Sequence, residues 1–360
     1  MSYGRQAAFW IAASLGLLLF LWLFRDILLP FIMGLALAYL LDPVADRLQR
    51  LGMNRLWATF AILVLSVVFF ALALLVLVPV LGAQLMAFIA RLPEHVARLQ
   101  ELADKLFETR FSEVLGGGDA RTAIQQFAGQ AASWLGTVVS SLWAGGRAVV
   151  NVVSLFVVTP VVAFYLLYDW DRMVAKIDDL LPRDHVGTIR ELGRRIDRAM
   201  AGFVRGQFAV CILLGTFYAI GLSVVGLNFG VLIGSIAGII SFIPYVGTIV
   251  GFVLSVGVAL VQFWPDWIWV AAVVGVFAVG QFIEGNILQP RLVGSSIGVH
   301  PVWLMFALFA FGSLFGFVGL LLAVPLTAAL GVLVRFALER YQHSRIYWGH
   351  DRSGPGEPLI

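Results

Sequence analysis

Long apolar runs separated by short polar segments are the dominant pattern of this chain. The runs cover residues 7–24, 27–41, 56–81, 148–168, 208–225, 229–263, 267–282 and 302–334. A transmembrane helix needs about 20 predominantly apolar residues, because the hydrocarbon core of a bilayer is about 30 Å thick. The pattern therefore predicts an all-α polytopic membrane protein with about eight transmembrane helices.

Two of these runs are too long to be simple spans. Residues 229–263 comprise 35 positions, and one continuous helix of that length would measure about 50 Å. Pro244 removes a backbone donor within this run, so we expect the helix to break there. The run 302–334 is interrupted by the glycine-rich residues 312–319. Two broken segments in one half of the chain are typical of secondary transporters, in which discontinuous helices line the solute path.

Residues 82–147 differ from the rest because charged side chains alternate with apolar ones at helical spacing. This spacing predicts an extramembrane amphipathic helical segment, in which Pro93 starts a second helix. Its apolar face lies on the membrane surface or on a neighbouring subunit, or it packs on itself as a cap. The expected organisation is N-terminal transmembrane helices (1–81), this segment (82–147), a transport core (148–340) and a polar C-terminal tail (341–360).

Composition narrows the function classes. Hydrophobic residues make up 61% of the chain and charged residues 12%, against about 45–50% and 25% in soluble domains. The net charge of +3 is small and dispersed, which argues against nucleic acid as a partner. Cys211 is the only cysteine, so an intrachain disulfide is impossible, and the five histidines show no metal-ligand spacing. We find no nucleotide-binding glycine motif and expect no cofactor or metal.

The distribution of Lys and Arg predicts the orientation. With eight crossings and the N-terminus inside, the inner segments carry sixteen basic residues, whereas the outer ones carry only Arg25 and Arg291, excluding the long segment 82–147. Basic residues accumulate on the cytoplasmic side of membrane proteins. Both termini are therefore expected in the cytoplasm. A single re-entrant hairpin would invalidate this count.

Candidate chemistry is concentrated at Glu284 and Arg291, the only charged residues between positions 267 and 334. A charge near the bilayer centre costs about 2.5–3.5 kcal/mol on insertion scales, so neither is expected to face lipid. Glu284 is a candidate solute ligand or proton carrier, with hydrogen bonds supplied by Gln281, Asn286 and Gln289. In the alternative interpretation, the two charges form a structural pair at a helix end.

Residues 294–298 match the G-x-S-x-G pattern of serine hydrolases. That motif acts on a strand-to-helix turn of a hydrolase sheet, which an all-helical membrane chain does not offer. We therefore expect no enzymatic activity and no catalytic residue.

Several separate motifs together resemble a known family. They are Arg205-Gly206-Gln207, residues 242–247 (FIPYVG), the E-x-N-x-x-x-P-x-x-x-G spacing from Glu284 to Gly294, His300-Pro301, and residues 311–316 and 323–326. In this order they resemble the autoinducer-2 exporter family of bacterial inner-membrane transporters. The likeness is strong over residues 159–336 and rests on hydropathy alone over residues 1–147.

The resemblance implies a multi-pass protein of the bacterial inner membrane that exports the quorum-sensing signal autoinducer-2. It also implies a homo-oligomer, with a pentamer as one form, and coupling to H+ or Na+. Sodium(lithium)/proton antiport is the alternative in the same class, and a membrane scaffold or interaction protein is the alternative from another class. The expected solute path consists of Phe242, Pro244, Tyr245, Gly247, Glu284, Asn286, Gln289, Pro290, Arg291, Gly294, Gly312, Ser313 and Gly316.

Overall fold

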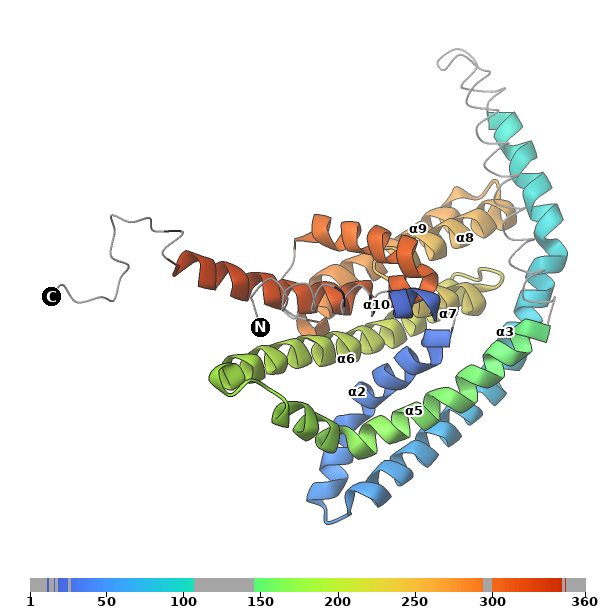
Figure 1. Cartoon of the computed structure of the whole chain (residues 1–360). Helices are drawn as coiled ribbons and strands as arrows, with labels where there is room; N and C mark the ends of the chain where they lie inside the picture. The colour runs from blue at the N-terminus through green and yellow to red at the C-terminus, as the bar shows by residue number, and fades with distance from the viewer. Residues whose placement is uncertain are drawn as a thin grey trace. The chain divides into compact units, whose positions relative to one another are not determined.

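A computed structural model describes residues 27–106, 146–293 and 300–344, together with 12, 16, 19–24 and 347. Within these residues there is no strand, and the chain is helical almost throughout (Figure 1). The helices are α2 (Leu28–Arg50), α3 (Arg55–Leu106), α5 (Gly146–Asp179), α6 (Val186–Val224), α7 (Gly230–Ile240), α8 (Val246–Phe263), α9 (Trp267–Ile283) and α10 (Pro301–Gln342), with a 3₁₀ turn at Arg183–His185 and a π-helix, η4, at Glu284–Val293. The all-α prediction is confirmed.

Six helices of the described residues are long and apolar enough to cross a membrane. They include α2, α3, α6 and α8, and also α9 continued by η4, and α10. The predicted span at residues 148–168 lies within α5, whereas most of the predicted first span, residues 7–24, lies outside the described residues. The structure is thus that of a polytopic membrane protein.

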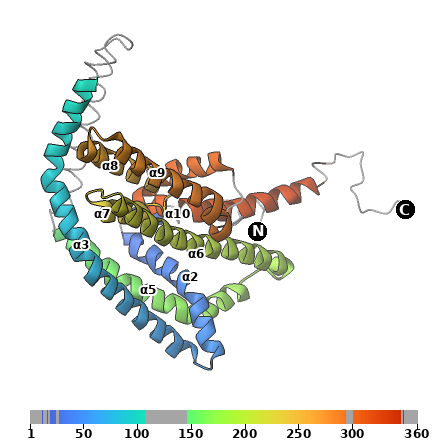
Figure 2. The ribbon, with the colours of Figure 1, turned by 180° about the vertical axis from the view of Figure 1, so that it is seen from behind.

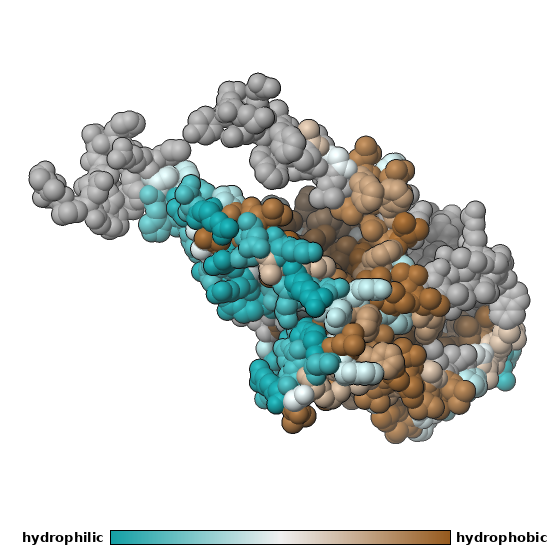
Figure 3. All heavy atoms as spheres, turned by 60° about the horizontal axis from the view of Figure 1, so that its bottom comes forward, coloured by the Kyte–Doolittle hydropathy of each residue, from teal (hydrophilic) through white to brown (hydrophobic). Residues whose placement is uncertain are grey.

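Exposed apolar side chains on α3 identify a surface suited to lipid. Leu65, Phe69, Leu72 and Leu75 are each more than half exposed. In the space-filling view, hydrophobic side chains cover broad areas next to a band of hydrophilic ones (Figure 3). An apolar surface on this scale would be unusual in a water-soluble monomer, and hydrocarbon is the environment that suits it.

Helix α3 extends far past the predicted third span. Its 52 residues correspond to about 78 Å, so the part beyond residue 81 continues the same helix past the predicted span as an arm. The expected start of a second helix at Pro93 is wrong, because α3 continues through that position. A proline within a helix removes one backbone hydrogen bond, and the long flanking helix tolerates this loss. Residues 107–145 lie outside the described part.

The described chain divides into two units. Unit 1 comprises residues 1–59, 161–207 and 290–360, and unit 2 comprises residues 60–160 and 208–289.

In unit 1, one guanidinium group connects the ends of several helices. Arg55 Nε donates to the carbonyl of Leu167 at 2.8 Å, and its two terminal nitrogens donate to Asp46 and Asp42, each at 3.2 Å. Arg205 Nε donates to the carbonyl of Tyr39 at 2.7 Å. These bonds tie α2 to the start of α3, to α5 and to α6, using charge-assisted contacts that only a planar fork of donors can make together.

In unit 2, a stripe of glycines brings α7 against the second half of α6. A Cβ added at Gly234 or Gly238 would overlap the backbone of α6, with Gly238 meeting Gly215, and one at Gly230 would lie in tight contact, 3.0 Å from the backbone of Leu222. Small residues four apart on one helix face allow a second helix to approach this closely. Gly226 does not take part, because it lies in the preceding turn with φ of +79°.

The predicted break at Pro244 is a full reversal of the chain within unit 2. Ala237 of α7 lies against Gly251 of α8, although a continuous helix would hold them about 21 Å apart. At the other end of the pair, the Gln262 side chain accepts from the backbone N–H of Asn228 at 2.8 Å. Both views show α7 and α8 as neighbouring helices (Figures 1 and 2). This segment is therefore an antiparallel helical hairpin with a short first leg of 11 residues.

The second predicted break, within α10, is also a reversal. Gly316 has φ of +60° and ψ of −137°, a conformation that only glycine adopts without strain. A Cβ on Gly319 would overlap the carbonyl of Phe311, and one on Gly312 would meet the Leu320 side chain. Residues eight apart in a straight helix are separated by about 12 Å, so α10 folds back on itself at Gly316.

Candidate functional site

Glu284 is the buried carboxyl around which the candidate site of unit 2 is built. It lies where α9 passes into η4, and only 7% of the residue is exposed. Thr248 Oγ1 donates a hydrogen bond to its Oε2 atom at 3.4 Å. Among the described residues of unit 2, no cationic side chain pairs with this carboxyl. A buried carboxylate that is hydrogen-bonded only by neutral groups can accept further hydrogen bonds or bind a cation, so it can contact a ligand.

Thr248 comes from the first turn of α8, directly after the reversal at Pro244. No side chain caps this helix, and its N-cap residue, Tyr245, has φ of +68°. The N-terminus of a helix carries a partial positive charge and unsatisfied N–H groups. The break therefore directs a polar helix end and a hydroxyl into the region of the carboxyl.

The π-helix η4 shapes the other side of the site. It has ten residues, and the wider turn of a π-helix brings positions five apart onto one face. The amide of Gln289, five residues after Glu284, accordingly interacts with the carboxyl. Such helices are rare and are frequently found at functional sites.

Other predicted path residues of this region are placed differently. Asn286 Nδ2 donates to the carbonyl of Phe282 in its own helix at 3.0 Å, so its amide is already engaged. Pro290 and Arg291 are exposed. Gly294 lies outside the described residues. Of the predicted hydrogen-bonding side chains, Gln289 is therefore the one that the structure brings to Glu284.

The predicted solute-path residues between positions 242 and 247 lie in the reversal between α7 and α8. Phe242 and Pro244 are half-buried, and Tyr245 is 47% exposed. Gly247 is buried, and a Cβ there would overlap the backbone of Ser241, so the tight turn requires glycine. The expected meeting of this break with Glu284 is supported by the Thr248 contact, four residues after Pro244.

The second break belongs to unit 1. Gly312 and Gly316 form its turn, and Ser313 Oγ donates to the carbonyl of Ala310 at 2.9 Å within the same helix. The expectation that these three residues join the Glu284 site stays a prediction.

The residue pattern did not single out three side chains near this carboxyl. Besides Thr248, they are Tyr218 and Cys211 of α6. Both are close enough to Glu284 for an electrostatic interaction with its carboxylate. Their common signal is that each carries a hydroxyl or thiol within the charge-free stretch from Gly206 to Pro265.

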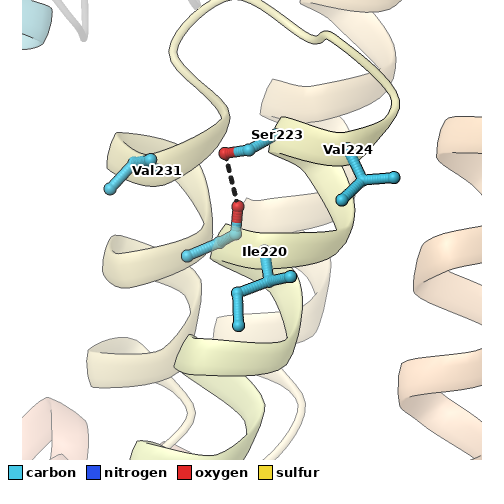
Figure 4. Close-up of a pocket in the computed structure, with 5 residues that line it drawn as sticks. Ile220, Ser223, Val224 and Val231 are labelled. Atoms are coloured by element: carbon cyan, nitrogen blue, oxygen red, sulfur yellow. Dashed lines mark hydrogen bonds between the residues drawn. The ribbon is translucent and has the colours of Figure 1, made fainter.

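A surface groove at the end of α6 is a different kind of feature. It is lined by Ala219, Ile220, Ser223, Val224 and Val231. Its only hydroxyl, on Ser223, donates to the carbonyl of Ala219 at 2.6 Å (Figure 4). The groove is apolar and open, so it lacks the free polar groups that a polar solute requires.

The described helices, their apolar surface and the two internal reversals define a multi-pass membrane protein of the transporter class. Sequence comparison agrees with this class. Residues 11–339 match the family described as "AI-2E family transporter", and the chain belongs to that family.

Relatives cover most of the chain. It is 31% identical over 357 residues to the protein named "Putative transport protein YrrI" of Bacillus subtilis (strain 168), covering 94% of this chain and 98% of that protein. It is 27% identical over 325 residues to the protein named "Putative permease PerM" of Escherichia coli (strain K12), covering 90% of each. A further relative, named "Putative transport protein YueF", also from Bacillus subtilis (strain 168), is 25% identical over 308 residues. The resemblance inferred from the motifs is thereby confirmed, and the chain is a transporter whose solute these names do not specify.

Proposed function

We propose that this protein exports a small polar solute of the autoinducer-2 type across the bacterial inner membrane, driven by an ion gradient. The observation that carries the proposal is the buried carboxyl of Glu284, hydrogen-bonded by Thr248 from the first turn of a broken helix. A carboxyl costs free energy in an apolar region, so its presence there calls for a function.

The arrangement suits a solute rich in hydroxyl groups. The carboxylate accepts hydrogen bonds, Gln289 both donates and accepts, and the uncapped N-terminus of α8 donates. In transporters, half-helix ends of this kind face the bound solute. The proposed path includes this cluster and the reversal at Pro244, and the coupling ion is a proton or sodium.

Export also requires a defined orientation, and we place both termini in the cytoplasm. Each hairpin returns the chain to the side of the membrane from which it came. Two hairpins therefore replace two crossings, the number of crossings stays even, and both termini remain on the same side. Arg291 then joins the inner side, which leaves Arg25 as the basic residue of the short outer segments. The charge asymmetry that favours this orientation becomes stronger.

Sodium(lithium)/proton antiport is the second candidate, because the same lone carboxyl would also bind a monovalent cation or a proton. Flux in proteoliposomes made from the purified protein tests both candidate functions, with autoinducer-2 and radioactive sodium as the two probes.

The variant Glu284→Gln keeps the shape of the side chain but removes its charge. We expect at least about a tenfold loss of flux of the transported probe, the effect of about 1.4 kcal/mol of lost binding.

Glu339→Gln is the matched control, since Glu339 is an exposed carboxyl near the end of α10, and its flux should equal that of the unmodified protein. Unchanged flux and unchanged pH dependence in Glu284→Gln would remove Glu284 from the mechanism.

The alternative of a membrane scaffold or interaction protein depends on the segment 82–147. Deleting residues 92–145, which leaves Gln84 and Phe88 of α3 in place, separates the roles: lost assembly with preserved flux would assign oligomer formation to this segment and transport to the rest. We expect the protein to form a homo-oligomer, with a pentamer as one possible form. Measuring the mass of the purified protein in detergent gives the number of subunits.

A further inference from the structure

Tyr218 carries a buried hydroxyl group that the proposed mechanism has not used. The residue lies in the second half of α6 and is 0% exposed. Its ring stacks on Phe277 of α9, with centroids 4.5 Å apart and an angle of 16° between the planes. Its hydroxyl has no hydrogen-bond partner within the part of the chain that the structure describes. A buried unpaired hydroxyl is destabilising, so it requires an explanation.

The hydroxyl lies close against α9 at Gly280, where there is no side chain. A Cβ added at Gly280 would overlap the edge of the Tyr218 ring and lie 2.6 Å from the hydroxyl oxygen. Gly280 precedes Glu284 by four residues, which is about one helical turn, or 6 Å along the axis. The phenol and the carboxyl therefore lie on the same face of α9. Tyr218 is also close enough to Glu284 for an electrostatic interaction with its carboxylate.

Packing alone does not account for a tyrosine at this position. The stacking on Phe277 involves only the ring, and phenylalanine would provide it without burying a hydroxyl. Thr59 carries the other buried side-chain oxygen without a partner among the described residues. It lies in unit 1, whereas only Tyr218 adjoins a candidate ligand site.

We propose that the Tyr218 hydroxyl is a binding residue of the Glu284 site and hydrogen-bonds the transported solute. This assignment rests on the proposed role of Glu284. A phenol both donates and accepts, so it complements a carboxylate, which only accepts, in holding a solute that bears hydroxyl groups. The absence of a side chain at Gly280 is what allows the hydroxyl to occupy this position beside α9.

The test is Tyr218→Phe in proteoliposomes, with autoinducer-2 as the probe and with the melting temperature measured in parallel. We expect the KM of transport to rise roughly three- to tenfold, as for one lost neutral hydrogen bond. The maximal rate should change little. The melting temperature should stay the same or rise, because the hydroxyl has no partner in the empty protein. Thr59→Val is the matched control and should leave KM unchanged.

An unchanged KM in Tyr218→Phe would overturn the assignment. A lower melting temperature or a failure to fold would also overturn it, since the hydroxyl would then have a structural partner. Glu284→Gln distinguishes the two proposals. Lost flux in that variant with an unchanged KM in Tyr218→Phe refutes the tyrosine alone, whereas full flux in Glu284→Gln refutes the site as a whole.

Discussion

The side-chain oxygen of Gln84 accepts a hydrogen bond from the backbone N–H of Leu232 at 3.0 Å, across 148 positions of the chain. Leu232 is the third residue of α7, a helix whose own N-cap residue, Phe229, provides no capping side chain. The ring of Phe88 also packs edge-on against Phe229, with centroids 5.4 Å apart. The long arm of α3 thus caps and covers the start of the hairpin that bears Thr248.

Gln84→Ala removes this cap. We expect the variant to lose about 1 kcal/mol of stability, the usual cost of an absent N-terminal cap. Hydrogen exchange at the Leu232 amide should become faster. The control is Gln281→Ala, because the Gln281 side chain is exposed. Equal exchange at Leu232 in the variant and the unmodified protein would contradict a capping role for Gln84.

Gly238 fixes the distance between α6 and α7. In Gly238→Ala, the new methyl group would overlap the backbone of Gly215, which no side-chain rotation can relieve. We expect a loss of about 1–3 kcal/mol, typical of overpacking, measured as a lower midpoint of unfolding in detergent.

The control for that variant is Gly257→Ala in α8, where no atom lies within 4 Å of an added Cβ. There the better helix propensity of alanine should leave stability unchanged or raise it by up to about 1 kcal/mol. Equal stability of the two variants would show that the α6–α7 contact is not close.

The sequence alone allowed both reversals to be located, because their causes are local. Pro244 and the glycines around Gly316 stand out in apolar runs that are too long to span. Whether the chain reverses or only bends was not predictable, since that depends on contacts such as Ala237 with Gly251. Glu284 was identifiable because a single carboxylate in an apolar region is costly.

Its neighbours were harder to find. Thr248 and Tyr218 carry no charge, so an apolar run accommodates them without an evident penalty. Their closeness to Glu284 arises only when α6, α8 and α9 pack together. Gln289 was predicted as a hydrogen-bonding residue, but the π-helix that turns it toward the carboxyl has no counterpart in the hydrophobic pattern.

Arg55 holds several helix ends of unit 1 together. Its side chain is only 16% exposed and contacts Asp42 and Asp46. Arg55→Ala removes this donor from both carboxylates and from the Leu167 carbonyl, although Asp42 keeps an ion pair with Arg205 at 4.0 Å. We expect a loss of about 1–3 kcal/mol, since the hydrogen bonds are charge-assisted but the carboxylates are partly exposed. Arg55→Lys should recover only part of it, because an ammonium group lacks the planar fork.

Arg172→Ala is the control for Arg55, because Arg172 is 71% exposed and contacts Asp169 and the Tyr168 ring of its own helix. Its effect should stay below about 1 kcal/mol. Chemical unfolding of the purified variants measures all three values. An Arg55→Ala variant no less stable than Arg172→Ala would show that the cluster does not join the helices.

Gly316 is the position where backbone conformation alone decides the outcome. No atom lies within 4 Å of an added Cβ, so Gly316→Ala meets no steric obstacle from its surroundings. Its φ of +60° and ψ of −137° are nevertheless costly for alanine, and we expect a loss of about 1–3 kcal/mol. Gly275→Ala has the same open surroundings within helix α9 and should be neutral or stabilising. If the α10 reversal belongs to the solute path, flux should fall in Gly316→Ala and not in Gly275→Ala. Normal flux in a destabilised Gly316→Ala protein would limit this reversal to a structural role.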